Sequence, residues 1–482
     1  MHRDTPGDAG AFHSGPLTVN DAALLTDLYE VTMAASYWRE RMQGAATFSL
    51  FVRRLPECRS FLVAAGLEDV VGYLQSFGFA PPGLRYLRSL GLFPDEFLEF
   101  LAGVRFSGSV RAVPEGAVVF PNEPLVEVTA PIIEAQLVET AVINLCHAQT
   151  TVASKAIRSV IAARGRPVIE FGLRRTPGLE AGMKAAQAAW IADAMQTSNV
   201  LAGLHYGIPP SGTMAHSYVS AFPSEQAAFR AFADAFPDHA VLLLDTYDTV
   251  GAAHKAVEVA RALAARGHRL AGVRLDSGDL AQLSEAVRRI LDQAGLPYVR
   301  IIASGNLDEA VVDRLVTAGA PIDAFGAGTR MNVSADAPYL DMAYKLVRYD
   351  GRDVLKLSAG KETWTGEKQV WRFSRGRSAA EDLIALREEP APAGGEPLLL
   401  EIMRGGRLIA PLPSLAEVRA RCAGEVAALP EQVRRLHHPD QYPVRYSARL
   451  RARQATLGAE VRSRELAVEP ESRFALQTRS AP

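Results

Sequence analysis

Short apolar runs, each ended by polar residues, recur through the central part of the chain between Val168 and Thr329. Runs of this kind are typical of strands buried on both faces of a parallel sheet. Helix-like segments at 249–266, 280–294 and 307–318 separate the last four runs. The runs end in FGLRR, LLLDTYD, VRLDSGD, IIASGN and FGAGT. This alternation predicts βα units and an α/β fold.

Polar residues end every one of these runs, which bears on the type of sheet. A (β/α) barrel collects site residues from the ends of many strands, whereas an open doubly wound sheet uses one switch point. We therefore expect an irregular (β/α) barrel, with the open sheet as the alternative. A sixth segment, SGTMAHS (211–217), lies between the first two runs and carries His216.

The segments before the barrel predict an α+β unit. Helical spacing predicts a first helix from Asp21 to about Arg41, and 45–56 alternates like a strand. Gly and Pro punctuation over 106–136 is typical of short strands in a small sandwich or barrel. A long apolar helical stretch should follow. It covers 131–164, with a break expected near Cys146.

After the barrel, 339–373 alternates like a β-meander and should complete the sheet of the first unit. Its expected turns lie at Asp350-Gly351 and around Gly360. The predicted organisation has five segments. They are a disordered tail (1–17), an N-terminal α+β domain (18–150), the barrel (151–338), a β-rich segment packing on the N-terminal domain (339–446) and a C-terminal extension (447–482).

Composition narrows the class of protein. The 482 residues carry a net charge of −2, which offers no broad basic field for a nucleic acid or an anionic membrane. The three cysteines form no CxxC pair and are expected to be reduced thiols. No apolar run approaches the roughly 18 residues that span a bilayer. We therefore expect a cytoplasmic protein.

Two Asp-rich strand ends offer both charge and helix caps. In RLDSGD, Arg274 could bind an anionic group and Asp276 could bind ribose hydroxyls or Mg²⁺, while Asp279 should cap the next helix. In DTYDT, Asp245 is the candidate site residue and Asp248 the candidate cap.

Glycine-rich turns follow the last two runs. In GAGT, backbone N–H groups and the Thr329 hydroxyl could hold a phosphate. Ser304-Gly305-Asn306 ends the preceding run in the same way, and barrels often hold phosphate between two late loops.

The first run ends in FGLRR. Arg174 in this motif could bind pyrophosphate, while Phe171 taken alone fits core packing better than ring stacking.

Other catalytic signatures are absent. Small neighbours leave His216 accessible, but no His, Cys or Asp grouping has zinc spacing. There is no GxSxG elbow and no GxxxxGK[ST] loop.

Eight motifs in order resemble the nicotinate phosphoribosyltransferase family and cover about residues 20–360. They are LLTDLYEVTM (24–33), FGLRR, QTSNVLAG (196–203), SGTMAHS, LLLDTYDT, GVRLDSGDL, ASGN and FGAGT. The family joins nicotinate to phosphoribosyl pyrophosphate in NAD biosynthesis, giving nicotinate mononucleotide and pyrophosphate. The reaction is coupled to ATP through a phosphohistidine and uses Mg²⁺.

The resemblance implies a role for each matching residue. His216 would be the phosphohistidine, and Arg274 with Thr213 would hold the nicotinate carboxylate. Phe171 would stack on the pyridine ring, and Tyr29 would contact nicotinate. The 5′-phosphate would lie against Ser304, Gly305, Gly328 and Thr329, with Arg174 on pyrophosphate.

Three further implications concern specificity, metal and assembly. Ser198 stands where relatives that take nicotinamide carry an aspartate, so a carboxylate substrate meets no repulsion. Asp245 or Asp276 would bind Mg²⁺. Family members are typically homodimers, in which case Asp27 and Tyr29 would act on the partner's site.

The alternatives are of three kinds. A related enzyme would act on nicotinamide or quinolinate. A sugar-phosphate isomerase or aldolase would share the phosphate turns but needs a Lys or Glu at a strand end, and Glu170 is expected inside its strand. A non-catalytic nucleotide-binding protein would not need His216, Arg274 and Asp276 together.

Overall fold

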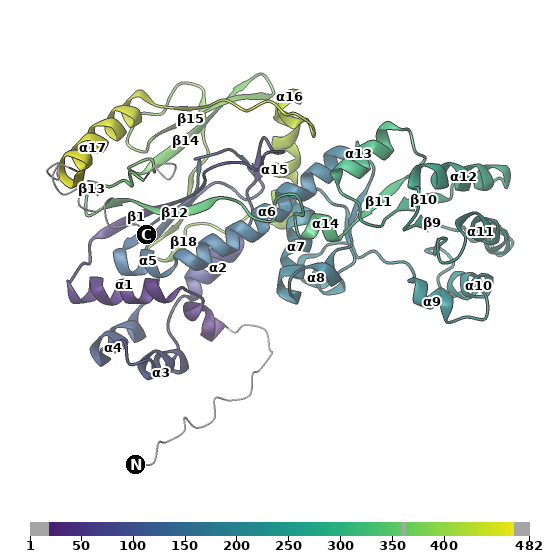
Figure 1. Cartoon of the computed structure of the whole chain (residues 1–482), viewed down its shortest axis with the longest axis horizontal. Coiled ribbons are helices and arrows are strands. Elements are labelled where there is room, and N and C mark those ends of the chain that lie inside the picture. Colours follow the sequence, from purple (N-terminus) through teal and green to yellow (C-terminus); the bar gives the residue numbers. More distant parts are fainter. Residues whose placement is uncertain (1–18, 359–362, 467–482) are drawn as a thin grey trace, which may run out of the picture.

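The chain forms two lobes (Figure 1), and the computed structural model describes residues 19–358 and 363–466. One lobe combines the N-terminal and C-terminal segments, and the other holds the central segment. Helix α6 (Glu139–Ala163) runs from the first lobe into the second. The predicted tail 1–17 and the end of the C-terminal extension lie outside the described residues.

A seven-stranded antiparallel sheet organises the first lobe. Across it lie β13 (Arg352–Asp353), β12 (Met342–Tyr349), β1 (Ala45–Val52), β5 (Pro124–Pro131), β3 (Ser109–Ala112), β17 (Leu400–Arg404) and β18 (Arg407–Leu408). Strand β1 pairs with β12 from Ala46–Tyr349 to Val52–Met342. The segment after the parallel sheet therefore completes the first sheet, as expected. The predicted turn at Asp350-Gly351 is present, with left-handed backbone at both residues (φ 47° and 75°).

Two smaller sheets pack in the same lobe. One contains β16 (Gly395–Pro397), β14 (Lys368–Arg375), β15 (Ser378–Leu386) and β19 (Val444–Tyr446), and the other pairs β2 (Leu62–Val63) with β4 (Val118–Val119). The expected sandwich over 106–136 is wrong, because β3 and β5 join the seven-stranded sheet while β4 pairs with β2. The meander is also interrupted, since β14 enters a different sheet from β12. The turn expected around Gly360 lies outside the described residues.

The second lobe contains a six-stranded sheet in which every pair is parallel. Its order is β7 (Gln196–Thr197), β6 (Val168–Glu170), β11 (Ala324–Ala327), β10 (Arg300–Ala303), β9 (Gly272–Leu275) and β8 (Val241–Leu243). The α/β class and all five predicted strands are confirmed. Among the described residues β7 and β8 remain edges, so the sheet is a half-barrel, with six strands where a closed barrel of this class has about eight.

Helices follow the strands of the half-barrel. They are α7 (Leu179–Ile191), α8 (Val200–Tyr206), α9 (His216–Ser220), α10 (Glu225–Ala235), α11 (Thr249–Ala264), α12 (Leu280–Gln293), α13 (Glu309–Thr317) and α14 (Thr329–Asn332). Both predicted caps are confirmed. Asp248 accepts the Gly251 N–H at 2.6 Å, and Asp279 accepts N–H groups of the first turn of α12.

The first lobe differs from expectation at two helix boundaries. Its helices are η1 (Val19–Leu24, 3₁₀), α1 (Leu28–Arg39), α2 (Leu67–Ser76), α3 (Pro81–Ser89), α4 (Asp95–Gly103), α5 (Ile132–Leu137), α15 (Leu415–Ala428), α16 (Glu431–Arg434) and α17 (Ala448–Leu466). Helix α1 begins at Leu28 rather than Asp21, because extended backbone at Asp27 separates it from η1. The break in the long helical stretch lies at Val138, and Cys146 is inside α6. No helix among the described residues is long and apolar enough to cross a membrane.

Candidate active site

The carboxyl ends of the parallel strands carry the polar residues that the sequence singled out. Arg274 lies on β9 with Asp276 just beyond it, Ser304 follows β10, and Thr329 follows β11. Asp245 follows β8. Because parallel strands end at one edge of their sheet, these side chains gather at a single rim.

Arg274 is a mostly buried cation at this rim, with 14% of its side chain exposed. Its Nη1 donates to the Thr213 hydroxyl at 2.6 Å and to the Met214 carbonyl at 3.4 Å. Its Nε is buried without a hydrogen-bond partner, and burial lowers the pKa of the guanidinium. Thr213 and Met214 therefore hold Arg274 in place, and its unpaired Nε keeps hydrogen-bonding capacity for an anion.

Asp276 connects Arg274 with two other rim residues. Its Oδ1 accepts a hydrogen bond from the Ser304 hydroxyl at 2.5 Å and lies 3.5 Å from Arg274 Nη2. Its Oδ2 lies 3.8 Å from Nε2 of His216, the first residue of α9. The His216 side chain is 45% exposed, so a ligand has access to the ring.

Asp245 has one oxygen without a partner. Its Oδ2 accepts from the Ser277 hydroxyl at 2.5 Å, whereas Oδ1 is buried and unpaired. A carboxylate oxygen of this kind suits Mg²⁺, which usually takes one or two protein carboxylates and keeps its other ligands as water and phosphate. The described residues contain no group of three or more acidic, histidine or cysteine side chains placed to hold a metal alone.

Glycines at the rim give room to close neighbours. A Cβ on Gly305 (φ 88°) would lie 1.8 Å from the Asp276 carbonyl oxygen, and one on Gly326 would lie 2.6 Å from the Phe171 ring. A Cβ on Gly328 would meet the Phe171 carbonyl at 2.8 Å. Phe171 itself is only partly buried, so its ring is not fully enclosed by the core.

Sequence comparisons cover almost all of this architecture. Residues 24–147, 167–364 and 391–454 match the models of the N-terminal domain, the family region and the C-terminal domain of nicotinate phosphoribosyltransferase. A relative from Mycobacterium tuberculosis (strain ATCC 25618 / H37Rv), nicotinate phosphoribosyltransferase pncB2, is 52% identical, covering 89% of this chain and 92% of its own. The nicotinate phosphoribosyltransferase of Bacillus subtilis (strain 168) is 36% identical, covering 88% and 92%.

The chain belongs to the nicotinate phosphoribosyltransferase family. The solved structure of human nicotinic acid phosphoribosyltransferase supports this, with a TM-score of 0.80 and 33% identity, covering 90% of this chain and 99% of that one. A Pyrococcus furiosus structure named nicotinate-nucleotide pyrophosphorylase matches with a TM-score of 0.72 at 24% identity, which supports the fold alone. The predicted family, and the prediction of an enzyme with nicotinate phosphoribosyltransferase activity in NAD biosynthesis, are confirmed.

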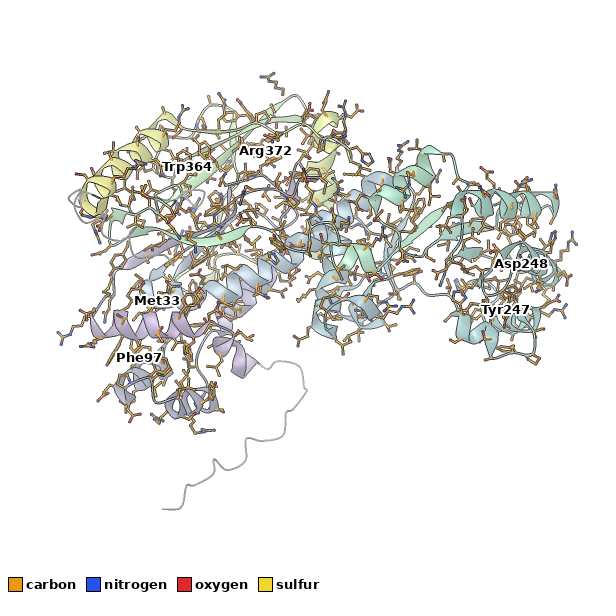
Figure 2. The ribbon with its side chains drawn as sticks, viewed as in Figure 1. Met33, Phe97, Tyr247, Asp248, Trp364 and Arg372 are labelled. Carbon is orange, nitrogen blue, oxygen red and sulfur yellow. The ribbon has the colours of Figure 1, made fainter. Side chains whose placement is uncertain are left out.

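Two residues matched to the family motifs lie away from the rim. Tyr29 and Asp27 are on and just before α1, which lies in the first lobe, and Figure 2 places Met33 of that helix far from Tyr247 beside the rim. The Asp27 carboxylate accepts from the Thr140 hydroxyl at 2.7 Å. Tyr29 is half exposed, and partial burial together with Glu139 raises the pKa of its phenol to about 12. A single chain does not bring these residues to the rim.

Two other residues that match family motifs, Arg174 and Ser198, lie near the rim strands but do not contact Asp276. Arg174 is an exposed residue in the short 3₁₀ helix after β6. Ser198 follows β7, and its N–H donates to the Glu170 carbonyl at 2.8 Å. Its side chain is partly buried and carries no charge.

Sequence reasoning missed two residues of this site. Thr246, in the loop after β8, has its hydroxyl 3.1 Å from His216 Nδ1. Glu170 was expected inside its strand, and it is the buried last residue of β6. Its carboxylate nevertheless accepts hydrogen bonds from Gly172, Thr197 and Asn332. The DTYDT motif pointed to the neighbourhood of Thr246, but no local pattern marks long-range hydrogen bonds of this kind.

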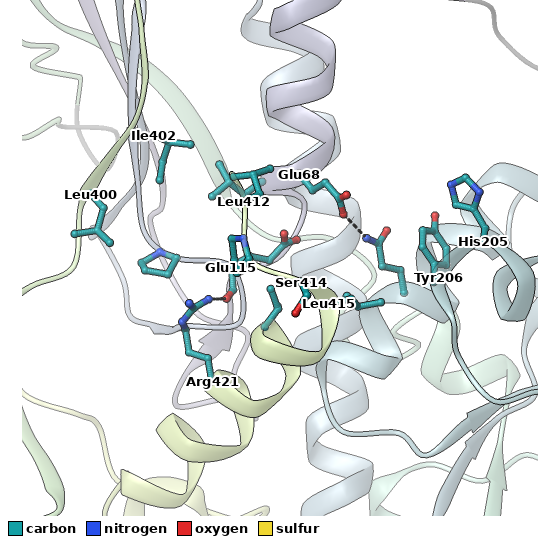
Figure 3. Close-up of a pocket in the computed structure, with 15 residues that line it drawn as sticks. Glu68, Glu115, His205, Tyr206, Leu400, Ile402, Leu412, Ser414, Leu415 and Arg421 are labelled. Carbon is teal, nitrogen blue, oxygen red and sulfur yellow. Dashed lines mark hydrogen bonds between the residues drawn. The ribbon is translucent and has the colours of Figure 1, made fainter. Parts of the chain in front are cut away.

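One cavity of the structure lies away from the rim. It has a volume of about 460 Å³ and lies between α2, α8 and α15, close to where the lobes meet (Figure 3). On its wall Gln187 donates to Glu68 at 3.1 Å, and Arg421 donates to the Glu115 carbonyl at 2.6 Å. No residue matched to the family motifs lines it, so the rim, and not this cavity, is the candidate active site.

Proposed function

We propose that the rim transfers the phosphoribosyl group of phosphoribosyl pyrophosphate to nicotinate, releasing pyrophosphate, and couples this to ATP hydrolysis through His216. The main support is the contact set of Arg274, Asp276 and His216 at one edge of the parallel sheet. The leaving pyrophosphate is strongly anionic and the ribose becomes cationic in the transition state. Such a reaction needs positioning and fixed charge more than a strong nucleophile.

Nicotinate is proposed to bind with its carboxylate toward Arg274. The buried, unpaired Nε and the Thr213 hydroxyl offer donors to that carboxylate. Phe171, partly open and packed against Gly326, would stack on the pyridine ring. Ser198 contributes no negative charge, which favours nicotinate over nicotinamide.

The phosphoribosyl pyrophosphate is proposed to lie along the glycine turns. Ser304, Gly305, Gly328 and Thr329 would hold the 5′-phosphate, because these turns let backbone N–H groups approach an anion closely. Arg174 is exposed and would contact pyrophosphate. Mg²⁺ would be held by Asp245, whose Oδ1 is unpaired, or by Asp276, and would offset phosphate charge.

His216 is proposed to accept the γ-phosphoryl group of ATP. The bond between the γ-phosphorus and the bridging oxygen breaks, a bond forms between phosphorus and a ring nitrogen, and ADP leaves. γ-Labelled ATP should give an acid-labile label on the wild type and none on His216→Ala. His205→Ala serves as a control, because His205 is exposed on α8 outside the rim, and it should label normally. Equal labelling of wild type and His216→Ala would show that His216 is not the phosphorylated residue.

The site is proposed to be completed in a homodimer. Tyr29 and Asp27 lie in the other lobe of the same chain, so they would reach the rim of a second copy. Mixing inactive Tyr29→Ala and inactive Arg274→Ala chains tests this. Partial recovery of activity, from dimers that hold one intact site, is expected. No recovery in mixtures proven to exchange subunits would contradict the proposal.

A coupled assay for nicotinate mononucleotide, with and without ATP, tests the whole reaction. We expect turnover with nicotinate that rises with ATP, and little turnover with nicotinamide or quinolinate. Turnover of nicotinamide alone would make the enzyme a different pyridine phosphoribosyltransferase. No turnover with any pyridine would favour a nucleotide-binding protein that kept the fold.

A further inference from the structure

Glu170 ends β6 and is almost fully buried, with 1% of its surface exposed. Among the described residues no lysine or arginine forms an ion pair with it, so neutral groups alone satisfy its carboxylate. Oε1 accepts the Gly172 N–H at 2.5 Å and the Asn332 amide at 2.8 Å, and Oε2 accepts the Thr197 hydroxyl at 2.5 Å. A buried carboxylate is costly, and several donors are needed to keep it there.

The three donors come from three different loops. Gly172 lies between Phe171 and Arg174 in the loop after β6. Thr197 directly precedes Ser198, and Asn332 ends the short helix that begins at Thr329. One carboxylate therefore ties together the loops that carry the pyridine, pyrophosphate and 5′-phosphate contacts.

The surrounding packing leaves these loops little freedom. A Cβ on Gly172 would lie 2.2 Å from Asn332 Cγ, so loop and helix are in close contact. Asn332 also donates to the Thr176 hydroxyl at 3.1 Å, and Thr176 donates to the Gly172 carbonyl at 3.0 Å. The Thr197 hydroxyl accepts the Asn199 N–H at 3.0 Å, which fixes the backbone around Ser198.

We propose that Glu170 is a positioning residue for phosphoribosyl transfer, because its carboxylate fixes the relative placement of the three substrate-binding loops. This role rests on the function proposed above. Glu170 touches no substrate and acts through Phe171, Ser198 and Thr329. Misplacement of all three loops should weaken the binding of both substrates, whereas loss of one bond should weaken only the substrate served by that loop.

Glu170→Gln keeps the shape of the side chain but has one acceptor oxygen in place of two. The three donors bond to both oxygens of Glu170, so the variant cannot accept all three bonds in the same way. We expect the KM values for nicotinate and for phosphoribosyl pyrophosphate each to rise about tenfold, with a smaller change in kcat. Thr197→Val should raise mainly the KM for nicotinate, and Asn332→Ala mainly that for phosphoribosyl pyrophosphate. The Glu170→Gln/Thr197→Val double variant should be non-additive, because the two residues share one bond.

Asp382→Asn is the matched control, since Asp382 is also a fully buried carboxylate but lies in the first lobe. It should leave both KM values of the folded enzyme unchanged. Amide hydrogen exchange measures the mobility of the loops without any substrate. Glu170→Gln should speed exchange in all three segments, 171–176, 196–200 and 329–333. If the amide hydrogens of the three segments exchange at wild-type rates and both KM values are unchanged, the positioning role is wrong. If exchange speeds up but the wild type shows no turnover with nicotinate, the proposed function fails while the coupling of the loops stands.

Discussion

Two arginines, one in each lobe, show how the same side chain can be used in opposite ways. Arg372 in the first lobe donates to Asp382 at 2.7 Å, to Glu425 at 2.8 Å and to the Val118 carbonyl at 2.9 Å. Burial opposes its charge, yet Asp382 together with Glu123 and Glu425 outweighs burial and raises the pKa of Arg372 above its ordinary value. Arg274 at the rim has a lowered pKa, because burial outweighs its contact with Asp276.

The difference separates a structural cation from a binding cation. Arg372 has its charge balanced within the fold, so it needs nothing from outside. Arg274 is oriented by Thr213 and retains a buried, unpaired Nε, so an incoming anion would improve its surroundings. Burial alone therefore does not identify a functional charged side chain. What identifies it is whether oppositely charged groups of the fold already balance the charge.

The largest expected effect concerns the stability of the first lobe. Asp382→Asn leaves Arg372 with a buried, poorly balanced charge and should lower the free energy of unfolding by about 3–5 kcal/mol. Urea denaturation measures this, and kcat/KM of the folded enzyme should be unchanged. A variant as stable as wild type would mean that Glu425 and Glu123 balance Arg372 without Asp382.

Arg274→Ala should give the reverse result. Loss of the cation removes the partner of the nicotinate carboxylate and should lower kcat/KM by about 10²- to 10³-fold, which corresponds to roughly 3–4 kcal/mol. Steady-state kinetics with nicotinate measures the loss, and the urea midpoint should move little. A large drop in stability with intact kcat/KM would reverse the roles assigned to the two arginines.

Glu115 is a buried carboxyl group whose charge no neighbouring cation among the described residues balances. Burial raises its pKa to about 7 although the Gly66 N–H donates to it at 2.6 Å. The folded state therefore keeps a proton that the unfolded chain releases above its own pKa near 4.5. The free energy of unfolding should fall as pH rises from about 4.5 to 7, by roughly 1–3 kcal/mol. Glu115→Gln should flatten this slope in denaturation series at pH 5 and pH 8, and an unchanged slope would assign it to another group.

Ser198→Asp should have the smallest effect. A carboxylate near the pyridine site would repel nicotinate and accept a hydrogen bond from an amide. We expect kcat/KM for nicotinate to fall about tenfold and the ratio of nicotinamide to nicotinate turnover to rise. A substrate panel measures both, and an unchanged ratio would remove Ser198 from substrate selection.

The sequence predicted the features that depend on local pattern. The five apolar runs became β6, β8, β9, β10 and β11. Asp248 and Asp279 cap helices because each cap depends on residues only two or three positions apart. Arg274, Asp276 and Ser304 were predicted at the ends of strands, whereas the contacts among them come from the structure.

What the sequence did not predict depends on distant partners. The start of α1 is set by extended backbone at Asp27, whose side chain bonds to Thr140 on another helix. Strand β7 has two residues, and it forms through pairing with β6 and a bridge from Thr197 to Pro210. The bond between Thr246 and His216, and the bonds of Glu170 to Thr197 and Asn332, join segments far apart in the chain, so no period or motif reports them.

The strand order of the seven-stranded sheet sets limits on synthesis of the chain. Strands β1, β5 and β3 leave the ribosome early, but their outer neighbours β12 and β17 come from residues 342–349 and 400–404. Both flanks of the nascent sheet therefore stay unpaired while the whole half-barrel is translated between them. Unpaired flanks invite association with other chains, and pairings this distant in sequence form slowly. The half-barrel can assemble first, and chains that stop before residue 400 should depend on chaperones to remain in solution.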